Sequence, residues 1–165
     1  MVEIKSVSVI GAGQMGSGIA HVCALGGYEV LLHDVSAERI EAGIATVKHN
    51  MTRQVARGQI TQDAMDAAIG LIRSAPELEV VGKSDIAIEA ATENEEVKKA
   101  IFRSLSPYLG AKTLLASNTS SISITRLASA TDRPERFIGL HFMNPVPRMN
   151  LVELIRGIAT DVETY

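Results

Sequence analysis

Short apolar runs alternate with amphipathic segments along the chain, in the order typical of a parallel α/β sheet. Residues 6–10 form a β-branched run that leads into a glycine turn, which predicts a strand buried on both faces. From Gln14 the apolar residues follow helical spacing as far as the pair Gly26-Gly27, which predicts a helix and its end. Residues 28–34 predict a second strand, so this region is interpreted as a right-handed βαβ unit.

The following segments predict two helices and then further strands of the same sheet. We expect a long helix from Ala37 to about Arg57, with Ser36 as N-cap, and a second from Thr61 to about Ile72. The other predicted elements are strands at 73–75, 85–89, 113–116, 137–142 and 151–156, and helices at 95–105 and 124–128. This pattern predicts an α/β fold: a Rossmann-type, doubly wound, mostly parallel sheet with an inserted antiparallel helical pair.

A glycine-rich turn lies between the first predicted strand and helix. It has the GxGxxG spacing that lets a backbone approach a pyrophosphate at a helix N-terminus. Its candidate cofactor-binding residues are Gly11, Gly13, Gln14, Met15 and Gly16. The strand and helix around the motif favour dinucleotide binding over the alternative, an ordinary βα turn.

Asp34 ends the second predicted strand, where a carboxylate accepts hydrogen bonds from the adenosine ribose hydroxyls. Its charge would repel a 2′-phosphate, so NAD is favoured over NADP. The alternative is a solvated carboxylate at a strand end. Arg39 is expected to lie one helical turn too far along to hold a phosphate.

Composition and charge exclude several other classes of protein. The 165 residues suit one domain, and we interpret 1–165 as a dinucleotide-binding domain that ends before it is complete. A net charge of −3 without a basic cluster argues against nucleic acid as a partner. Apolar runs are too short to span a membrane, and a single cysteine, Cys23, forms no internal disulfide. We expect a cytoplasmic protein without a metal site.

Short hydrogen-bonding side chains fill residues 117–121, directly after a predicted strand. Ligands of doubly wound folds bind at the carboxyl ends of the strands, so this cluster is a candidate part of the site. Its alternative role is to cap the helix predicted at 124–128.

His141 ends another predicted strand, and Glu153 lies on the strand that returns after the prolines of residues 145–147. If the chain folds back there, the two side chains face each other. A carboxylate on one ring nitrogen would fix the tautomer and leave the other nitrogen free to take a proton from an alcohol. The pair is a candidate dehydrogenase dyad; the alternative is a structural histidine.

Three motifs together carry a resemblance that covers the whole chain. They are Gly11-Ala12-Gly13-Gln14-Met15-Gly16, Ser117-Asn118-Thr119-Ser120-Ser121, and His141-Phe142-Met143-Asn144-Pro145 with Leu151-Val152-Glu153. The sequence resembles the L-3-hydroxyacyl-CoA dehydrogenases, in particular the bacterial 3-hydroxybutyryl-CoA dehydrogenases. The resemblance implies interconversion of (S)-3-hydroxyacyl-CoA and 3-ketoacyl-CoA by hydride transfer with NAD(H).

The resemblance also implies roles for single residues. His141 would be the general acid/base, Glu153 its orienting partner and Ser120 a donor to the substrate oxygen. The implied cofactor contacts are Glu93, Lys98, Asn118 and Asn144, with Asn144 also near the substrate. The alternative for residues 93–98 is a solvated helix start whose acidic residues complement the helix dipole.

The long helical pair matches the coenzyme A arm of that family. His49, Arg53 and Arg57 are spaced four apart and share one helix face, which could meet the 3′-phosphate or be an ordinary solvated face. The family's second, all-helical domain, which closes the cleft and makes most of a homodimer interface, is missing from these residues. Two other functions stay open: a non-catalytic dinucleotide-binding module, and a dehydrogenase of free hydroxyacids.

Overall fold

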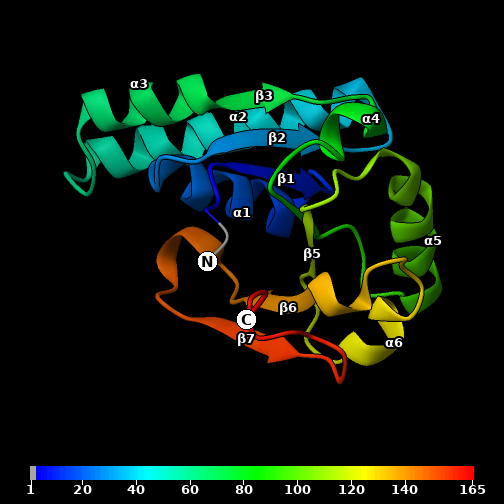
Figure 1. Ribbon diagram of the computed structural model, residues 1–165. Coiled ribbons are helices and arrows are strands. Elements are labelled where there is room, and N and C mark those ends of the chain that lie inside the picture. The colour runs from blue at the N-terminus through cyan, green and yellow to red at the C-terminus, as the bar shows by residue number, and fades with distance from the viewer. Residues whose placement is uncertain (1–2) are drawn as a thin grey trace.

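The computed structural model describes residues 3–165 and contains a seven-stranded sheet with helices on both faces (Figure 1). The strands are β1 (Ser6–Ile10), β2 (Glu29–His33), β3 (Ile72–Ser74), β4 (Ile86–Glu89), β5 (Leu114–Ser117), β6 (Phe137–Phe142) and β7 (Val152–Arg156). Their spatial order is β3-β2-β1-β4-β5-β6-β7, and β7 pairs antiparallel with β6 whereas the other pairs are parallel. The strand order switches direction between β1 and β4, which confirms the predicted Rossmann-type sheet.

Helices cover the two faces of this sheet. One face carries α1 (Gln14–Leu25), α2 (Ala37–Ala56) and α3 (Gln62–Leu71), and the other carries α4 (Leu78–Val81), α5 (Glu95–Leu105) and α6 (Ile124–Ala128). Three 3₁₀ turns complete the elements: η1 (Ser106–Tyr108), η2 (Pro134–Arg136) and η3 (Val146–Arg148). Helices α2 and α3 lie side by side at one end of the molecule, as the predicted helical pair requires (Figure 1).

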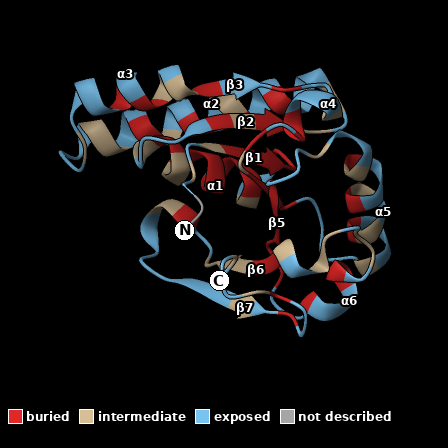
Figure 2. Ribbon diagram, in the orientation of Figure 1, coloured by how far each residue is buried: buried red, intermediate tan, exposed pale blue. Residues whose placement is uncertain are grey.

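Two hydrophobic cores lie on the two faces of the sheet. Val9 and Leu32 are fully buried beneath α1 and α2, whereas Leu115 and Phe137 are fully buried on the side of α5. Figure 2 shows the central strands as buried along their length. Because both faces are covered, β4 and β5 have apolar residues at consecutive positions, and even the small polar Ser8 of β1 is fully buried.

The predicted helix ends are also observed. The Ser36 hydroxyl accepts a hydrogen bond from Arg39 N–H, and the Thr61 hydroxyl accepts one from Ala64 N–H. Gly26 is the C-cap of α1, and Gly27 follows it with φ of +87°. The glycine pair therefore ends α1 because a side chain at that φ would be strained.

Several local expectations need correction. Strand boundaries move by a residue, and the short strand predicted at 73–75 lies at 72–74. Helix α4 was not expected, because it has only four residues and directly follows the turn at Pro76. The proposal that residues 117–121 cap α6 is wrong, since the cap is Ser123, whose hydroxyl accepts from Arg126 N–H.

Candidate active site

The glycine turn lies at the carboxyl end of β1 and has the shape that a pyrophosphate needs. Gly11 has φ of +108°, and its N–H donates to the His33 carbonyl at 2.8 Å. A Cβ on Gly16 would lie 1.6 Å from the Gly11 carbonyl oxygen, so this glycine is required by the packing of the turn. A Cβ on Gly13 would meet nothing within 4 Å, so the space above it is open to a ligand.

The N-terminus of α1 opens onto the same space. No side chain among residues 3–165 caps it, so the first N–H groups of the helix remain available to an anion. Gln14 is exposed, and its amide donates to the Asn144 side-chain oxygen at 3.3 Å. Met15 is half-buried and packs against the core beneath the turn. The turn, the free helix end and Gly13 together fit a dinucleotide pyrophosphate.

Asp34 follows β2, and its carboxylate already holds the turn in place. One oxygen accepts from Ala12 N–H at 2.8 Å and the other from Val35 N–H at 2.7 Å. Arg39 Nη1 lies 3.5 Å from the same carboxylate, so Arg39 pairs with Asp34, and the expectation that it does not hold a phosphate stays a prediction. The first turn of α2 starts beside the end of β2, and this brings the guanidinium back over Asp34.

A pocket of about 470 Å³ adjoins Asp34 on the side of α5. Most of its surface is apolar, which suits the flat ring of a nucleotide base next to a ribose. It is lined by Ile10, Gly11, His33, Asp34, Val35, Arg39, Leu78, Ala91, Thr92, Val97, Ala100, Ile101 and Ser104. The position beside both the glycine turn and Asp34 is where the adenosine half of a dinucleotide would lie.

The antiparallel pair β6–β7 brings His141 and Glu153 directly opposite each other. Nδ1 of His141 lies 2.7 Å from Oε2 of Glu153, with the side chains 21% and 50% exposed. Since a carboxylate only accepts, Nδ1 is the donor of this hydrogen bond, and in the neutral form of the ring that tautomer places the lone pair on Nε2. Nε2 makes no hydrogen bond within residues 3–165 and is free to accept a proton.

The polar cluster after β5 divides into buried and exposed members. Asn118 is 9% exposed, and its Oδ1 accepts from the N–H of Phe142, the residue after His141. Thr119 is buried and its hydroxyl donates to the carboxylate of the exposed Glu93. Ser120 is exposed and makes no hydrogen bond among the described residues, so its hydroxyl is available to a ligand.

Lys98 lies in the interior, with 1% of its residue surface exposed. Its Nζ donates to Oε2 of Glu89 at 2.6 Å and to the Asn118 carbonyl at 3.2 Å. A solvated helix start is therefore wrong for Lys98, although it describes the exposed Glu93. Glu89 was not among the predicted site residues, because a carboxylate at the end of an apolar strand carries no motif.

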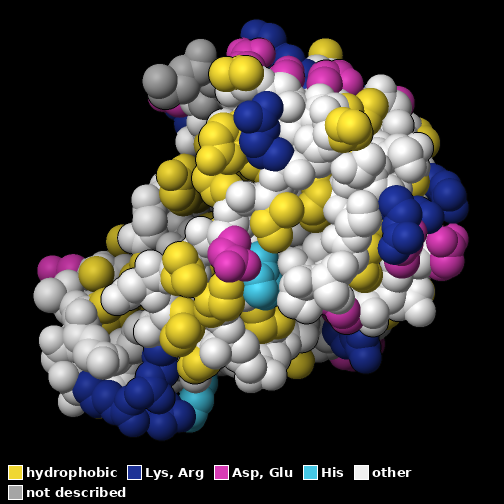
Figure 3. Space-filling model, turned by 90° about the horizontal axis from the view of Figure 1, so that it is seen from below, with side chains coloured by type: hydrophobic (Ala, Val, Ile, Leu, Met, Phe, Trp, Pro, Cys, Tyr) yellow, Lys and Arg dark blue, Asp and Glu magenta, His cyan; other side chains and the backbone are white. Residues whose placement is uncertain are grey.

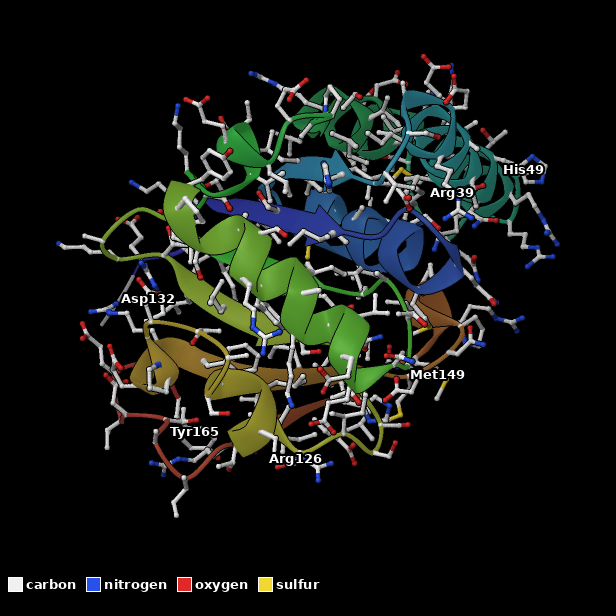
Figure 4. All side chains as sticks on the ribbon, turned by 90° about the vertical axis from the view of Figure 1, so that its right-hand side faces the viewer. Arg39, His49, Arg126, Asp132, Met149 and Tyr165 are labelled. Atoms are coloured by element: carbon white, nitrogen blue, oxygen red, sulfur yellow. The ribbon has the colours of Figure 1, made fainter. Side chains whose placement is uncertain are left out.

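The basic face of α2 borders a second pocket, of about 150 Å³. Arg53 and Arg57 line it together with Arg148, which was not among the predicted site residues. His49 is exposed but does not line the pocket, and in Figure 4 it lies farther out than Arg39. Figure 3 shows a group of Lys and Arg side chains with a His beside it at one corner of the molecule.

His21 of α1 lines the same pocket and is 1% exposed. Burial lowers the pKa of His21 below its usual value of 6.5, and the hydrogen bond to Gln54 at 2.8 Å opposes this shift in part. Nδ1 has no partner among the described residues. Protonating this ring would place an unsatisfied N–H in the interior, which favours the neutral form of His21 in the same direction as burial.

Comparison with known proteins identifies the family. A model of the 3-hydroxyacyl-CoA dehydrogenase NAD-binding domain matches residues 6–165. The chain belongs to this family. The resemblance carried by the three motifs is therefore confirmed, and so is the assignment of NAD as the cofactor of this fold.

Curated relatives and solved structures agree with this family. The chain is 58% identical over 162 residues to a 3-hydroxybutyryl-CoA dehydrogenase of Bradyrhizobium diazoefficiens, covering 98% of this chain and 55% of the relative. A probable 3-hydroxybutyryl-CoA dehydrogenase of Bacillus subtilis is 47% identical, with 98% and 56% covered. The crystal structure of (S)-3-hydroxybutyryl-CoA dehydrogenase from Ralstonia eutropha superposes with a TM-score of 0.95 at 43% identity, with 98% and 57% covered.

The chain thus spans a little over half the length of these relatives. Within this family the chain corresponds to the NAD-binding domain. Among residues 3–165, no helix combines the length and apolar character that crossing a membrane requires.

Proposed function

We propose that this chain is the NAD-binding and proton-transferring part of an enzyme that interconverts (S)-3-hydroxyacyl-CoA and 3-ketoacyl-CoA. The observation that carries the proposal is the pair of His141 and Glu153, 2.7 Å apart at the same sheet edge as the glycine turn. A module that only bound a dinucleotide would need no such pair. The named relatives favour 3-hydroxybutyryl-CoA and acetoacetyl-CoA as the substrates.

The chemistry follows from the free lone pair on Nε2 of His141. Bound NAD would supply the hydride acceptor for the carbon that bears the hydroxyl group. Nε2 takes the hydroxyl proton, so a C=O bond forms while the ring becomes a cation. Glu153 stabilises that cation through Nδ1, and in the reverse direction the same Nε2 returns the proton.

Two other side chains are placed to orient the substrate oxygen. Ser120 has an exposed hydroxyl without a partner among residues 3–165, and we propose that it donates to that oxygen. Asn144 is held by Gln14 at 3.3 Å, which links the turn after β6 to the cofactor-binding helix. This contact supports the proposal that Asn144 lies near both nicotinamide and substrate.

Coenzyme A would be held by the basic pocket beside α2. Arg53, Arg57 and Arg148 converge there, and guanidinium groups bind phosphate oxygens through paired N–H donors. A free hydroxyacid would make no use of this pocket. Its presence therefore supports the acyl-CoA thioester over the free-acid alternative.

The test is NAD reduction with 3-hydroxybutyryl-CoA, measured on the full-length polypeptide to which these residues belong. His141→Ala should lower kcat by roughly 10²–10⁴, the usual contribution of a positioned general base, while NADH affinity stays within about threefold. Combining it with Glu153→Gln should cost little more than His141→Ala alone, because both act on one proton transfer. A wild type that binds NADH but oxidises no 3-hydroxyacyl-CoA would instead indicate a binding module.

The exposed apolar residues of β7, such as Leu154 at 51%, are consistent with a surface that another domain or subunit covers. A cleft-closing helical domain, a homodimer and a cytoplasmic location remain predictions. Size-exclusion chromatography with light scattering on the full-length polypeptide tests the dimer.

A further inference from the structure

Glu89 is a fully buried carboxylate at the carboxyl end of β4, next to the point where the strand order switches direction. Its Oε2 accepts from Lys98 Nζ at 2.6 Å and from the Ser117 hydroxyl at 2.7 Å. Its Oε1 accepts from Ala91 N–H at 2.7 Å. One carboxylate therefore joins the loop after β4, helix α5 and the end of β5.

The same network reaches the catalytic strand through Asn118. The Asn118 N–H donates to the Glu89 carbonyl at 2.7 Å, and its carbonyl accepts from Lys98. Its Oδ1 accepts from Phe142 N–H at 3.0 Å, immediately after His141. Since a backbone N–H only donates, the orientation of the Asn118 amide is fixed.

This orientation leaves the NH₂ group of Asn118 without a partner among the described residues. That NH₂ group is also not among the buried polar atoms that are shut off from solvent. It is therefore available as a donor at the carboxyl ends of the parallel strands, where the glycine turn also lies. Burying the Glu89–Lys98 ion pair has an energetic cost, because both charged groups must lose their water.

We propose that Glu89 is a positioning residue. Through Lys98, Ser117 and the backbone of Asn118 it holds the ends of β4, β5 and β6 in register, so that the Asn118 donor and His141 keep their places around the cofactor. Glu89 does not touch the cofactor or substrate; it acts through its hydrogen-bonded partners. The inference rests on the proposed function for its kinetic test, but not for its cofactor-binding test.

The experiment compares two buried serines in the full-length polypeptide. Ser117→Ala removes one hydrogen bond to Glu89. Ser84→Ala removes a buried hydroxyl that donates to the carbonyls of Val81 and Ile86. Ser84 precedes β4 and so lies at the amino ends of the strands, away from the glycine turn and His141. Ser117→Ala should lower kcat by roughly 10-fold and Glu89→Gln by roughly 10–100-fold, since small misplacements of reacting groups have effects of this size. Both should weaken NADH binding severalfold and leave the KM for 3-hydroxybutyryl-CoA within about threefold.

Ser84→Ala should lower the melting temperature about as much as Ser117→Ala yet leave kcat and NADH affinity unchanged. Equal effects of the two serine changes on kcat and NADH affinity would overturn the proposal, as would unchanged NADH affinity in both Ser117→Ala and Glu89→Gln. If Glu89→Gln does not fold, the serine pair still decides. If the wild type lacks dehydrogenase activity, the proposed function fails while NADH affinity still tests Glu89.

Discussion

Cofactor preference offers the sharpest test of the geometry around Asp34. Its carboxylate accepts from Ala12 N–H and Val35 N–H and retains capacity for ribose hydroxyls, because a carboxylate has about four acceptor positions. Hydrogen bonds to a charged group contribute about 1.5–3 kcal/mol. Asp34→Ser should therefore weaken NADH binding by about 2–3 kcal/mol, or roughly 30–150-fold in Kd.

Arg39 makes this prediction different from a simple loss of affinity. Its guanidinium lies 3.5 Å from the Asp34 carboxylate and is 69% exposed, so removing Asp34 frees it to bind a 2′-phosphate. NADPH binding should then improve by roughly 10-fold despite the solvent exposure, as expected for a charge-assisted pair near water. The ratio of the two dissociation constants should shift by roughly 10²–10³ in favour of NADPH.

The assay is fluorescence titration with NADH and NADPH. The ratio is the required readout, because Asp34→Ser also leaves Ala12 N–H without its acceptor, and a change in the shape of the turn would affect the binding of both cofactors equally and cancel in the ratio. Asp34→Ser/Arg39→Ala is the matched control and should lose the gain in NADPH binding. An unchanged ratio in Asp34→Ser would refute the role of Asp34, and equal NADPH affinity in the single and double variants would refute that of Arg39.

Three other predictions follow from the same structure. Gly13→Ala should have a melting temperature within about 2 °C of the wild type but bind NADH at least roughly 10-fold more weakly, because its Cβ fills only the open ligand space. Gly16→Ala should melt at a much lower temperature, because its Cβ would collide with the Gly11 carbonyl oxygen. Arg53→Ala with Arg57→Ala should raise the KM of acetoacetyl-CoA more than that of a pantetheine thioester without the nucleotide, and equal losses would indicate a role in stability. Burial lowers the pKa of His21 in the folded chain, so below about pH 6.5 the unfolded chain binds a proton at His21 more readily than the folded chain does. The free energy of unfolding should therefore fall as the pH drops below about 6.5. His21→Gln should flatten that decline in thermal melts between about pH 7.5 and pH 5.5, and an unchanged slope would contradict the assignment.

Local sequence signals predicted the parts of the site that depend on a single turn or hairpin. The glycine turn is specified by its own residues and by the strand and helix that flank it. His141 and Glu153 pair because two adjacent antiparallel strands place them opposite each other across a short connection. In both cases the contact partners are close in sequence, so spacing alone carries most of the information.

The interior of the site could not be predicted in this way. Lys98 follows a helical pattern in which a lysine normally faces solvent, yet its partner Glu89 is nine residues earlier on a different element. Arg148 joins Arg53 only because η3 packs against α1 beside the end of α2. Contacts of this kind depend on how separate elements are arranged, and no local spacing encodes that arrangement.

The arrangement of the central strands also sets the distance between the two halves of the candidate site. The glycine turn and Asp34 lie on the β1–β2 side of the sheet, whereas His141 and Glu153 lie on the β6–β7 side, so neither group of residues alone fixes the distance between the two groups. The strands between them, β4 and β5, set that distance, and they are joined at their ends by Glu89. The buried ion pair of Glu89 and Lys98 therefore lies between the glycine turn and the pair of His141 and Glu153, where a loss of rigidity would change their separation. Substitutions in this central region should alter cofactor affinity and kcat together, whereas substitutions at either side should alter mainly one of them.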